Sequence, residues 1–274
     1  MPLVTALWGI GLVSIVAVSL LSTSHVSYRL ARHAVEAAQA DALAEAGLNR
    51  AILALLDPQF DRRPRTDGVA QRLTFESSSL LVSIQDELGR IDLNQADGWV
   101  LVNLFQSVGL DFQPASNLVD KILDWRDSGS LKRLNGAKEP EYRAAGLPYR
   151  PRNGPFQSVD ELKLVLDMTP DLFRRVEPAV TVYSGRQFVD PQVAPREVLL
   201  ALPSMDADKV DSLIQSRSQQ LFDTAGQTLL SLSGRAFTVR IEMNRSDGIV
   251  RRQWVIRLTD SPTQPYWLLS QKSG

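Results

Sequence analysis

An uncharged apolar run at the N-terminus sets the first limit on how this chain can fold. Residues 3–21 (LVTALWGIGLVSIVAVSLL) contain no charged side chain. At a rise of ~1.5 Å per residue, a helix of this length crosses a hydrocarbon core of ~30 Å. The next stretch, residues 22–28, is polar but lacks proline and glycine, so nothing in it ends a helix. We therefore expect one transmembrane helix that continues beyond the membrane.

The Ala-rich segment 29–56 predicts the second half of the same helix. Its apolar side chains recur at spacings of three and four, which places them on one face of a helix: Leu48, Ile52, Leu55 and Leu56. Asp57-Pro58 ends the helix, because proline disfavours helical backbone in the residue before it. The chain therefore begins as one rod, apolar in its first half and amphipathic in its second.

A cleaved secretory signal is the alternative interpretation of the apolar run. Such signals have a basic front, a short apolar core and a cleavage site with small residues. Ser-Thr-Ser at 22–24 would suit cleavage, but Met1-Pro2 is uncharged and the run has almost the full length of a membrane span. A membrane anchor is the favoured interpretation.

The composition excludes several classes of chemistry. Cysteine is absent, so disulfides and thiolate metal sites are excluded. The two histidines, His25 and His33, both lie in the predicted N-terminal helix, which leaves the rest of the chain without an imidazole for a catalytic triad or a zinc site. We also find no glycine-rich phosphate loop and no nucleophile paired with a base. We therefore predict that the protein is not an enzyme.

Strand-like and helix-like patterns alternate in blocks along the remaining chain. Residues 69–75 and 80–85 have the composition of strands, and residues 94–217 show helical periods. Strand patterns then return, with a hairpin signal at Asp247-Gly248: residues 227–232, 237–244, 249–258 and an edge strand at 266–270. This order predicts an α+β fold, in which one antiparallel sheet packs on the long helix and an all-α domain of helical hairpins is inserted between strands.

The same reasoning divides the chain into four parts. The transmembrane part is 1–24, the helix continuation with the first strands is 25–93, the inserted α-domain is 94–217, and the strands that complete the sheet are 218–274. Within the α-domain we expect helices at residues 95–108, 114–127, 158–166, 170–176, 194–202 and 206–215. Thr169-Pro170 has the sequence of a helix start, and Ser158 with Glu161 has that of a capping box.

Helical hairpins raise the hypothesis of DNA binding, because a helix-hairpin-helix module offers backbone N–H groups to a phosphate. The candidate turns are 107–111, 166–171 and 202–208; each carries an acidic residue, and only the first contains glycine. Residues 92–217 hold 18 acidic and 15 basic side chains, a net charge of 15 − 18 = −3. A packing scaffold is therefore favoured, no nucleic-acid partner is expected, and a membrane-anchored DNA-binding protein of an uptake apparatus is the alternative.

Four acidic residues form a candidate calcium site at the end of one predicted helix and in the loop that follows: Asp124, Asp127, Glu139 and Glu141. Carboxylates from a helix end and a loop are typical oxygen ligands of Ca²⁺. The alternative is a solvated acidic loop whose charges are neutralised by neighbouring cations: Lys132, Arg133, Lys138 and Arg143.

Several segments together resemble the K-type minor pseudopilin family of bacterial type II secretion systems, and they occur in the family's order. They are PLVT at 2–5, DALAEAGLNRAI at 41–52, ELGRIDLNQAD at 87–97, the long stretch 147–185 that begins LPYRPRNGPF, and VDPQVAPREVLLALP at 189–203. These segments are spread over residues 2–203 of the chain.

The resemblance implies a pilin-like fold with a large α-domain inserted, and a single-pass inner-membrane protein with its globular part in the periplasm. It implies a tip complex with the I-type and J-type minor pseudopilins, above the remaining pseudopilus subunits. The bulky insert would block any subunit from sitting above, so the chain would cap the pseudopilus. The assembly helix would begin with Leu3, Val4, Thr5 and Leu7.

The chain departs from the family pattern in three places. Prepilins carry a short basic leader that a peptidase removes, and Met1 stands where the mature chain would begin, so processing is implied by the resemblance only. Thr5 stands where most pseudopilins have glutamate, and the K-type class is the one that lacks this glutamate. A subunit at the top has no neighbour above whose amine must be neutralised, so the resemblance implies that a carboxylate there would be unpaired and unfavourable in hydrocarbon. In the family's acidic calcium loop, Gly129 and Lys138 stand at positions usually held by acids.

Overall fold

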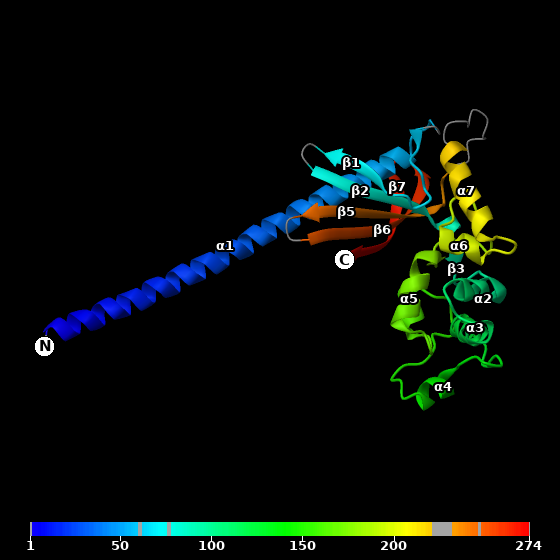
Figure 1. The fold of residues 1–274 in the computed structure, drawn as a ribbon, viewed down its shortest axis with the longest axis horizontal. Coiled ribbons are helices and arrows are strands. Elements are labelled where there is room, and N and C mark those ends of the chain that lie inside the picture. The colour runs from blue at the N-terminus through cyan, green and yellow to red at the C-terminus, as the bar shows by residue number, and fades with distance from the viewer. Residues whose placement is uncertain (1, 60–61, 76–77, 221–231, 246–247, 274) are drawn as a thin grey trace.

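The long N-terminal helix dominates the shape of the molecule. The computed structural model describes residues 2–59, 62–75, 78–220, 232–245 and 248–273, although not the side chains of 13, 15–27, 78, 218–220 and 245. Helix α1 (Pro2–Leu55) is continuous, as the sequence predicts. Its N-terminal half extends away from the rest of the molecule, and its C-terminal half lies along the sheet (Figure 1).

The predicted membrane span at 3–21 falls partly outside the described side chains. Within the residues that are described, no helix combines the length and the apolar character needed to cross a membrane.

In the part of the chain that the structure describes, five strands form one antiparallel sheet in the order β1-β2-β5-β6-β7. The strands are β1 (Gln71–Phe75), β2 (Ser78–Asp86), β5 (Ala236–Arg245), β6 (Gly248–Ser261) and β7 (Gln264–Ser273). The predicted hairpin is the β5–β6 pair, and the predicted edge strand at 266–270 is part of the longer β7. The strand predicted at 227–232 lies almost entirely outside the described residues.

The first hydrophobic core lies between α1 and the sheet. Small and branched side chains of α1 pack on the inner face of β2, β5 and β6; they are Ala40, Ala44, Leu48, Ala51, Ile52 and Leu55. Gly47 brings the helix close to β5, because a Cβ at this position would lie 2.7 Å from the Ile241 Cδ1 atom. The predicted apolar face is thus confirmed, except that Leu56, beyond the last helical residue, is 38% exposed.

The remaining helices lie in sequence between β2 and β5, which pair with each other. We call residues 94–217 the helical region. Its α-helices are α2 (Gly98–Ser107), α3 (Phe112–Arg126), α4 (Glu139–Ala144), α5 (Pro170–Val176), α6 (Arg196–Ala201) and α7 (Ala207–Gln220), which runs three residues past its end. The strand β3 (Ile91–Asp92), just before the helical region, pairs in parallel with β4 (Val180–Thr181), which follows α5 within it.

The sequence predicts a capped helix start at two places, and the structure contains one of the two caps. Thr169 Oγ1 accepts a hydrogen bond from the Leu172 N–H (3.2 Å), so the predicted start of α5 is confirmed. The predicted capping box at Ser158 is wrong, because this serine makes no side-chain cap and Glu161 binds Arg152 instead, with Nε 2.6 Å from Oε2. Residues Val159–Leu164 consequently form a 3-10 helix rather than an α-helix.

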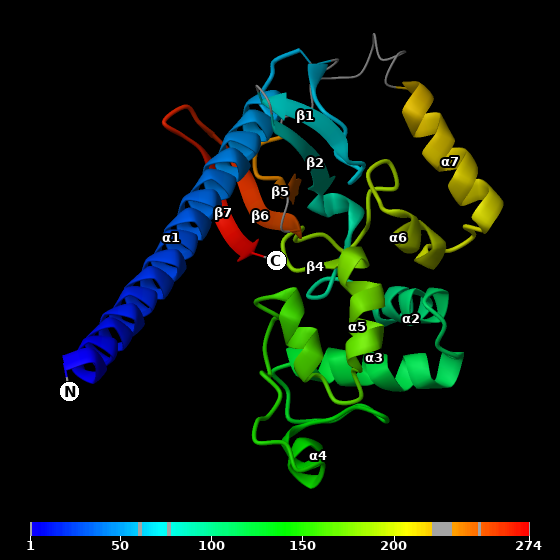
Figure 2. The same cartoon turned by 60° about the vertical axis from the view of Figure 1, so that its left-hand side comes forward.

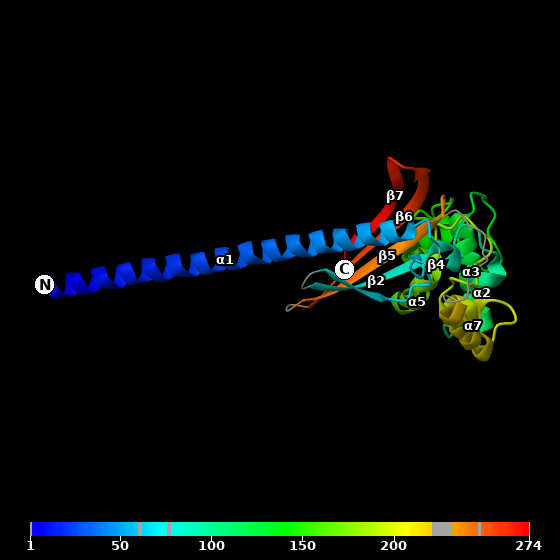
Figure 3. The same cartoon turned by 90° about the horizontal axis from the view of Figure 1, so that it is seen from above.

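The helical region has a hydrophobic core of its own, built around α2, α3, α5 and α6. It lies at the end of the sheet that is far from the N-terminus of α1 (Figure 1), and α2, α3 and α5 are grouped together within it (Figure 2). Seen from above, the rod, the sheet and the helical region follow one another along the long axis (Figure 3).

Candidate functional site

The first residues of α1 form an exposed apolar surface. Leu3, Val4 and Leu7 are 81%, 54% and 69% exposed, and Thr5 Oγ1 donates to the Pro2 carbonyl of the same helix (2.8 Å). A run of large exposed apolar side chains indicates contact with another protein or with a membrane. Thr5 carries no charge, and its hydroxyl finds a partner within the helix, so this apolar segment contains no unpaired polar side chain at this position.

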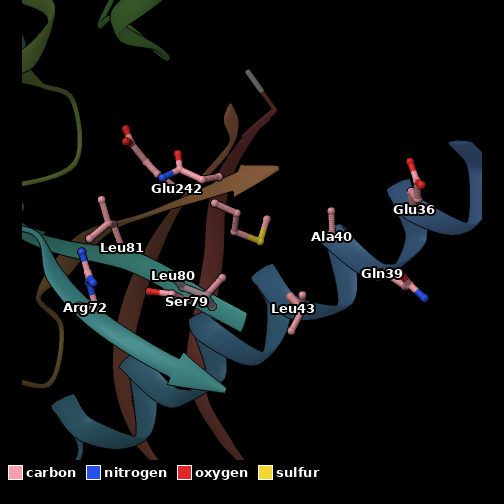
Figure 4. Close-up of a pocket in the computed structure, with 11 residues that line it drawn as sticks. Glu36, Gln39, Ala40, Leu43, Arg72, Ser79, Leu80, Leu81 and Glu242 are labelled. Atoms are coloured by element: carbon pink, nitrogen blue, oxygen red, sulfur yellow. The ribbon is translucent and has the colours of Figure 1, made fainter. Parts of the chain in front are cut away.

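A groove opens where α1 leaves the sheet, between the helix and strands β1, β2 and β5 (Figure 4). Its volume is about 490 Å³, and it is lined by apolar side chains such as Leu43 and Leu80 with charged residues Glu36, Arg72 and Glu242. The mixture of an apolar floor and a charged rim suits contact with another protein segment better than catalysis.

The four residues of the predicted calcium site do not surround one point. Asp124, at the end of α3, is fully buried, and its carboxylate accepts from the Arg133 side chain (2.7 Å) and backbone N–H (3.1 Å). Glu139 pairs with Arg143 (2.6 Å) and Glu141 with Lys132 (2.9 Å). Across the described part of the chain, no group of three or more acidic or imidazole side chains is placed to hold a metal.

Local hydrogen bonds also keep two of these carboxylates ionised. The Gly129 N–H, which donates to Asp127, lowers the pKa of that carboxyl, and the Arg133 guanidinium lies 3.7 Å from it. The Lys132 ammonium lowers the pKa of Glu141, which also accepts from the Lys138 N–H (2.9 Å) at the start of α4. The charges that would attract Ca²⁺ therefore already have partners within the chain.

Lys138 places a buried positive charge inside this loop. Its side chain is buried, and the Nζ atom donates to the backbone carbonyls of Asp124 (2.8 Å) and Asp127 (2.8 Å) and to Asn153 Oδ1 (3.3 Å). The residues present therefore do not fit a calcium ion at this point. Nothing in the sequence pointed to a role for Asn153. For Lys138 the sequence did offer a sign, because a basic residue stands there at a position where the family usually has an acid.

The turn between α2 and α3 was the best candidate for a phosphate site. Its Gly109 has a φ of 101°, and the preceding Val108 carbonyl accepts from Arg175 Nη1 (2.8 Å). Arg175 is itself paired with Asp171. The arginine that contacts the turn is thus bound by an acid of the same chain, and Asp111 follows the turn in sequence. Nothing in this arrangement favours the DNA-binding alternative.

A buried polar cluster lies at the end of the sheet, where the chain leaves β2 toward the helical region, and it was not predicted from the sequence. Asp86, at the end of β2, is fully buried, accepts from the Leu88 N–H (2.9 Å) and pairs with Arg235. The adjacent Glu87 accepts from Thr238 Oγ1 on β5 (2.6 Å). Burial raises the pKa of Asp86 to about 6, although the Arg235 charge opposes this shift.

The raised pKa predicts a dependence of stability on pH. Asp86 binds its proton more tightly in the folded state than in the unfolded state, so its contribution to stability is complete below the unfolded pKa of 3.8 and is lost as the pH rises through about 6. A shift of this size corresponds to roughly 2–3 kcal/mol.

We expect the difference in unfolding free energy between the native protein and Asp86→Asn to shrink by this amount from pH 4 to pH 7, in urea titrations at several pH values. Taking the difference between the two unfolding free energies isolates Asp86, because the other carboxyls titrate in the same way in both proteins. A constant difference across this range would contradict the prediction.

Comparison with known proteins supports the resemblance that the sequence motifs indicate. Residues 81–185, from β2 to the loop after β4, match the family described as Type II secretion system (T2SS), protein K. Type II secretion system protein K of Dickeya chrysanthemi is 27% identical over 150 residues, which cover 51% of this chain and 41% of that protein. The Klebsiella pneumoniae protein of the same name is 27% identical over 158 residues, covering 57% and 47%. These matches thus span less than half of the relatives' length.

A solved structure has the same fold. It is described as the crystal structure of the GspK-GspI-GspJ complex from the enterotoxigenic Escherichia coli Type 2 Secretion System, and it aligns with a TM-score of 0.60 over 89% of this chain and 98% of the other. The sequence identity is 16%, so this likeness concerns the fold, which combines a long helix, an antiparallel sheet and a helical region. The matched segment at residues 81–185 and the curated relatives thus make this chain similar to the type II secretion system protein K family, and the solved structure agrees with that likeness in its fold.

Proposed function

We propose that the protein is a minor pseudopilin that caps the tip of a type II secretion pseudopilus, with I-type and J-type minor pseudopilins as its partners. In this proposal the fold is pilin-like, with the α-domain at residues 94–217 inserted between strands β2 and β5. The start of α1 anchors the chain in the inner membrane, and the globular part lies in the periplasm. The protein acts as a structural subunit and carries out no catalysis.

The observation that carries this proposal is the position of the helical region. It lies beyond the end of the sheet, on the side away from the N-terminus of α1 (Figure 3). In a filament whose subunits stack by their N-terminal helices, this is the side on which the next subunit would sit. The helical region would fill that space, so that no subunit could be added above.

The exposed apolar residues on α1 and the groove beside it suit packing against partner subunits. Val35 is 57% exposed, and Glu36, Gln39 and Ala40 that follow it line the groove. We expect Val35→Glu to abolish co-purification with the I-type and J-type proteins, because a charge would be buried at the helix contact. The measurement is tagged pull-down of the full chain co-expressed with both partners in detergent.

Leu131→Glu is the matched control, since this side chain is 86% exposed but lies in the acidic loop far along the chain from α1. Equal loss in both variants, or failure of the native chain to retain either partner, would contradict the proposed complex.

The capping role has a separate test. If each fibre carries one cap and the pool of major pseudopilin is fixed, mean fibre length should fall in inverse proportion to the amount of this chain. We expect that doubling its expression about halves the mean length measured by electron microscopy, with the Val35→Glu variant at equal expression as the control. Unchanged lengths would argue against a cap even if the complex forms.

A further inference from the structure

We propose that the Lys138 ammonium is the built-in cation of the acidic loop, occupying the place of a metal ion, so that this loop is stable without calcium. The inference concerns residues 124–141 and the contacts described above, and it is independent of the proposed capping role.

The surroundings of Lys138 are those of a cation site. An ammonium has three N–H donors, and here three oxygen atoms face it: two backbone carbonyls and one side-chain amide oxygen. The carbonyls belong to Asp124 and Asp127, at the C-terminal end of α3, where helix carbonyls lack partners within the helix and the helix dipole favours positive charge. Lys138 is only 6% exposed, so its charge is held among these oxygens and not in solvent.

The charges of the loop balance without an added ion. Residues 124–141 contain four acidic and four basic side chains. All four acids have basic partners, because Asp124 and Asp127 face Arg133, Glu139 faces Arg143 from the next turn of α4, and Glu141 faces Lys132. A divalent ion in this loop would place two positive charges next to the Lys138 ammonium. The carboxylates that would bind the ion would also have to leave their arginine and lysine partners.

The backbone keeps Asp124 in this arrangement. Gly136 passes so close to the carboxylate that a Cβ would lie 1.8 Å from Asp124 Oδ2. The carboxylate is thus enclosed between Gly136 and Arg133, which donates to it from both its backbone and its side chain. Trp125, next in the helix, stacks on Phe156 with ring centroids 6.1 Å apart, so the loop and the core of the helical region depend on the same helix end.

The first test uses the native full chain in mild detergent. We expect its melting temperature to be the same, within about 1 °C, in EDTA and in millimolar CaCl₂, and we expect no saturable binding of ⁴⁵Ca²⁺. A rise in melting temperature with CaCl₂, or saturable calcium binding, would overturn the proposal without any variant being needed.

The second test exchanges the internal cation. Lys138→Met leaves the buried carbonyls without a donor, and we expect its melting temperature to fall by about 5 °C or more. Lys138→Asp places a carboxylate beside the same carbonyl oxygens, and we expect it to be destabilised in EDTA and stabilised again by CaCl₂, with calcium binding that the native chain lacks.

Lys132→Met is the matched control, because Lys132 lies in the same loop but pairs with Glu141 at the surface, where its side chain is 42% exposed. We expect its melting temperature to stay within about 2 °C of the native value. A Lys138→Met variant as stable as the control, or a Lys138→Asp variant that ignores calcium, would show that Lys138 does not stand at a cation position.

Discussion

Replacing Gly89 with alanine is expected to destabilise the protein by about 3 kcal/mol or more, the cost of forcing extra atoms into a packed site. Gly89 lies at the end of the short 3-10 helix Glu87–Gly89, where the chain leaves the sheet for the helical region. A Cβ at this position would lie 2.3 Å from the Val193 carbonyl oxygen and 2.9 Å from the Ala194 Cα. These are backbone atoms, which cannot turn away as a side chain could.

The segment around Val193 is itself held in place by hydrogen bonds to the same junction. Gln85 Nε2 donates to the Val193 carbonyl (2.8 Å), and the Asp190 N–H donates to the Leu88 carbonyl (2.8 Å). Because neither segment is free to move, the added methyl group should separate the sheet from the helical region. The free energy of unfolding from urea titration measures the effect.

Gly154→Ala is the control for Gly89→Ala. The nearest atom to a Cβ there is the Arg152 Cγ, at 3.8 Å, so a methyl group fits. We expect its unfolding free energy to change by no more than about 1 kcal/mol. Similar losses in both variants would mean that alanine is harmful for general reasons, and that the close contact with Val193 is not the cause.

Replacing Arg235 with methionine should destabilise the protein by about 3 kcal/mol at pH 7, because it leaves the buried Asp86 carboxylate without its ion-pair partner. Methionine retains much of the apolar stem, so the loss reports mainly on the charge. The effect should be smaller at pH 5, where Asp86, with a pKa of about 6, is already largely protonated in the folded protein.

Arg251→Met provides the comparison for this effect, since Arg251 forms a surface pair with Glu242 and its side chain is 54% exposed. We expect a change of about 0.5 kcal/mol or less for that variant. Adding Asp86→Asn to Arg235→Met should recover most of the lost stability at pH 7. If the loss were the same at pH 5 and pH 7, or persisted in the double variant, the ionised Asp86 would not be its source.

The regular elements could be predicted from the sequence to the extent that local patterns decide them. The apolar face of α1, the alternation in β5 and β6 and the Thr169 cap of α5 each depend on residues a few positions apart. Helix α4 was missed, because the surrounding stretch is rich in glycine, proline and arginine and the helix has only six residues. Glu161 was misassigned, since Arg152, which the spacing of a capping box does not take into account, binds its carboxylate.

The rod, the sheet, most of the helices and the lack of imidazole or thiolate chemistry in the globular part therefore follow from local patterns and composition. Three features come from contacts between distant segments: Lys138 lies among three oxygen atoms, Asp86 pairs with Arg235 across 149 positions, and Gly89 packs against the backbone of Val193. Periodicity reports which face of an element is buried. It does not report which distant group meets that face, and in a buried site that partner sets the charge state and the fit of each side chain.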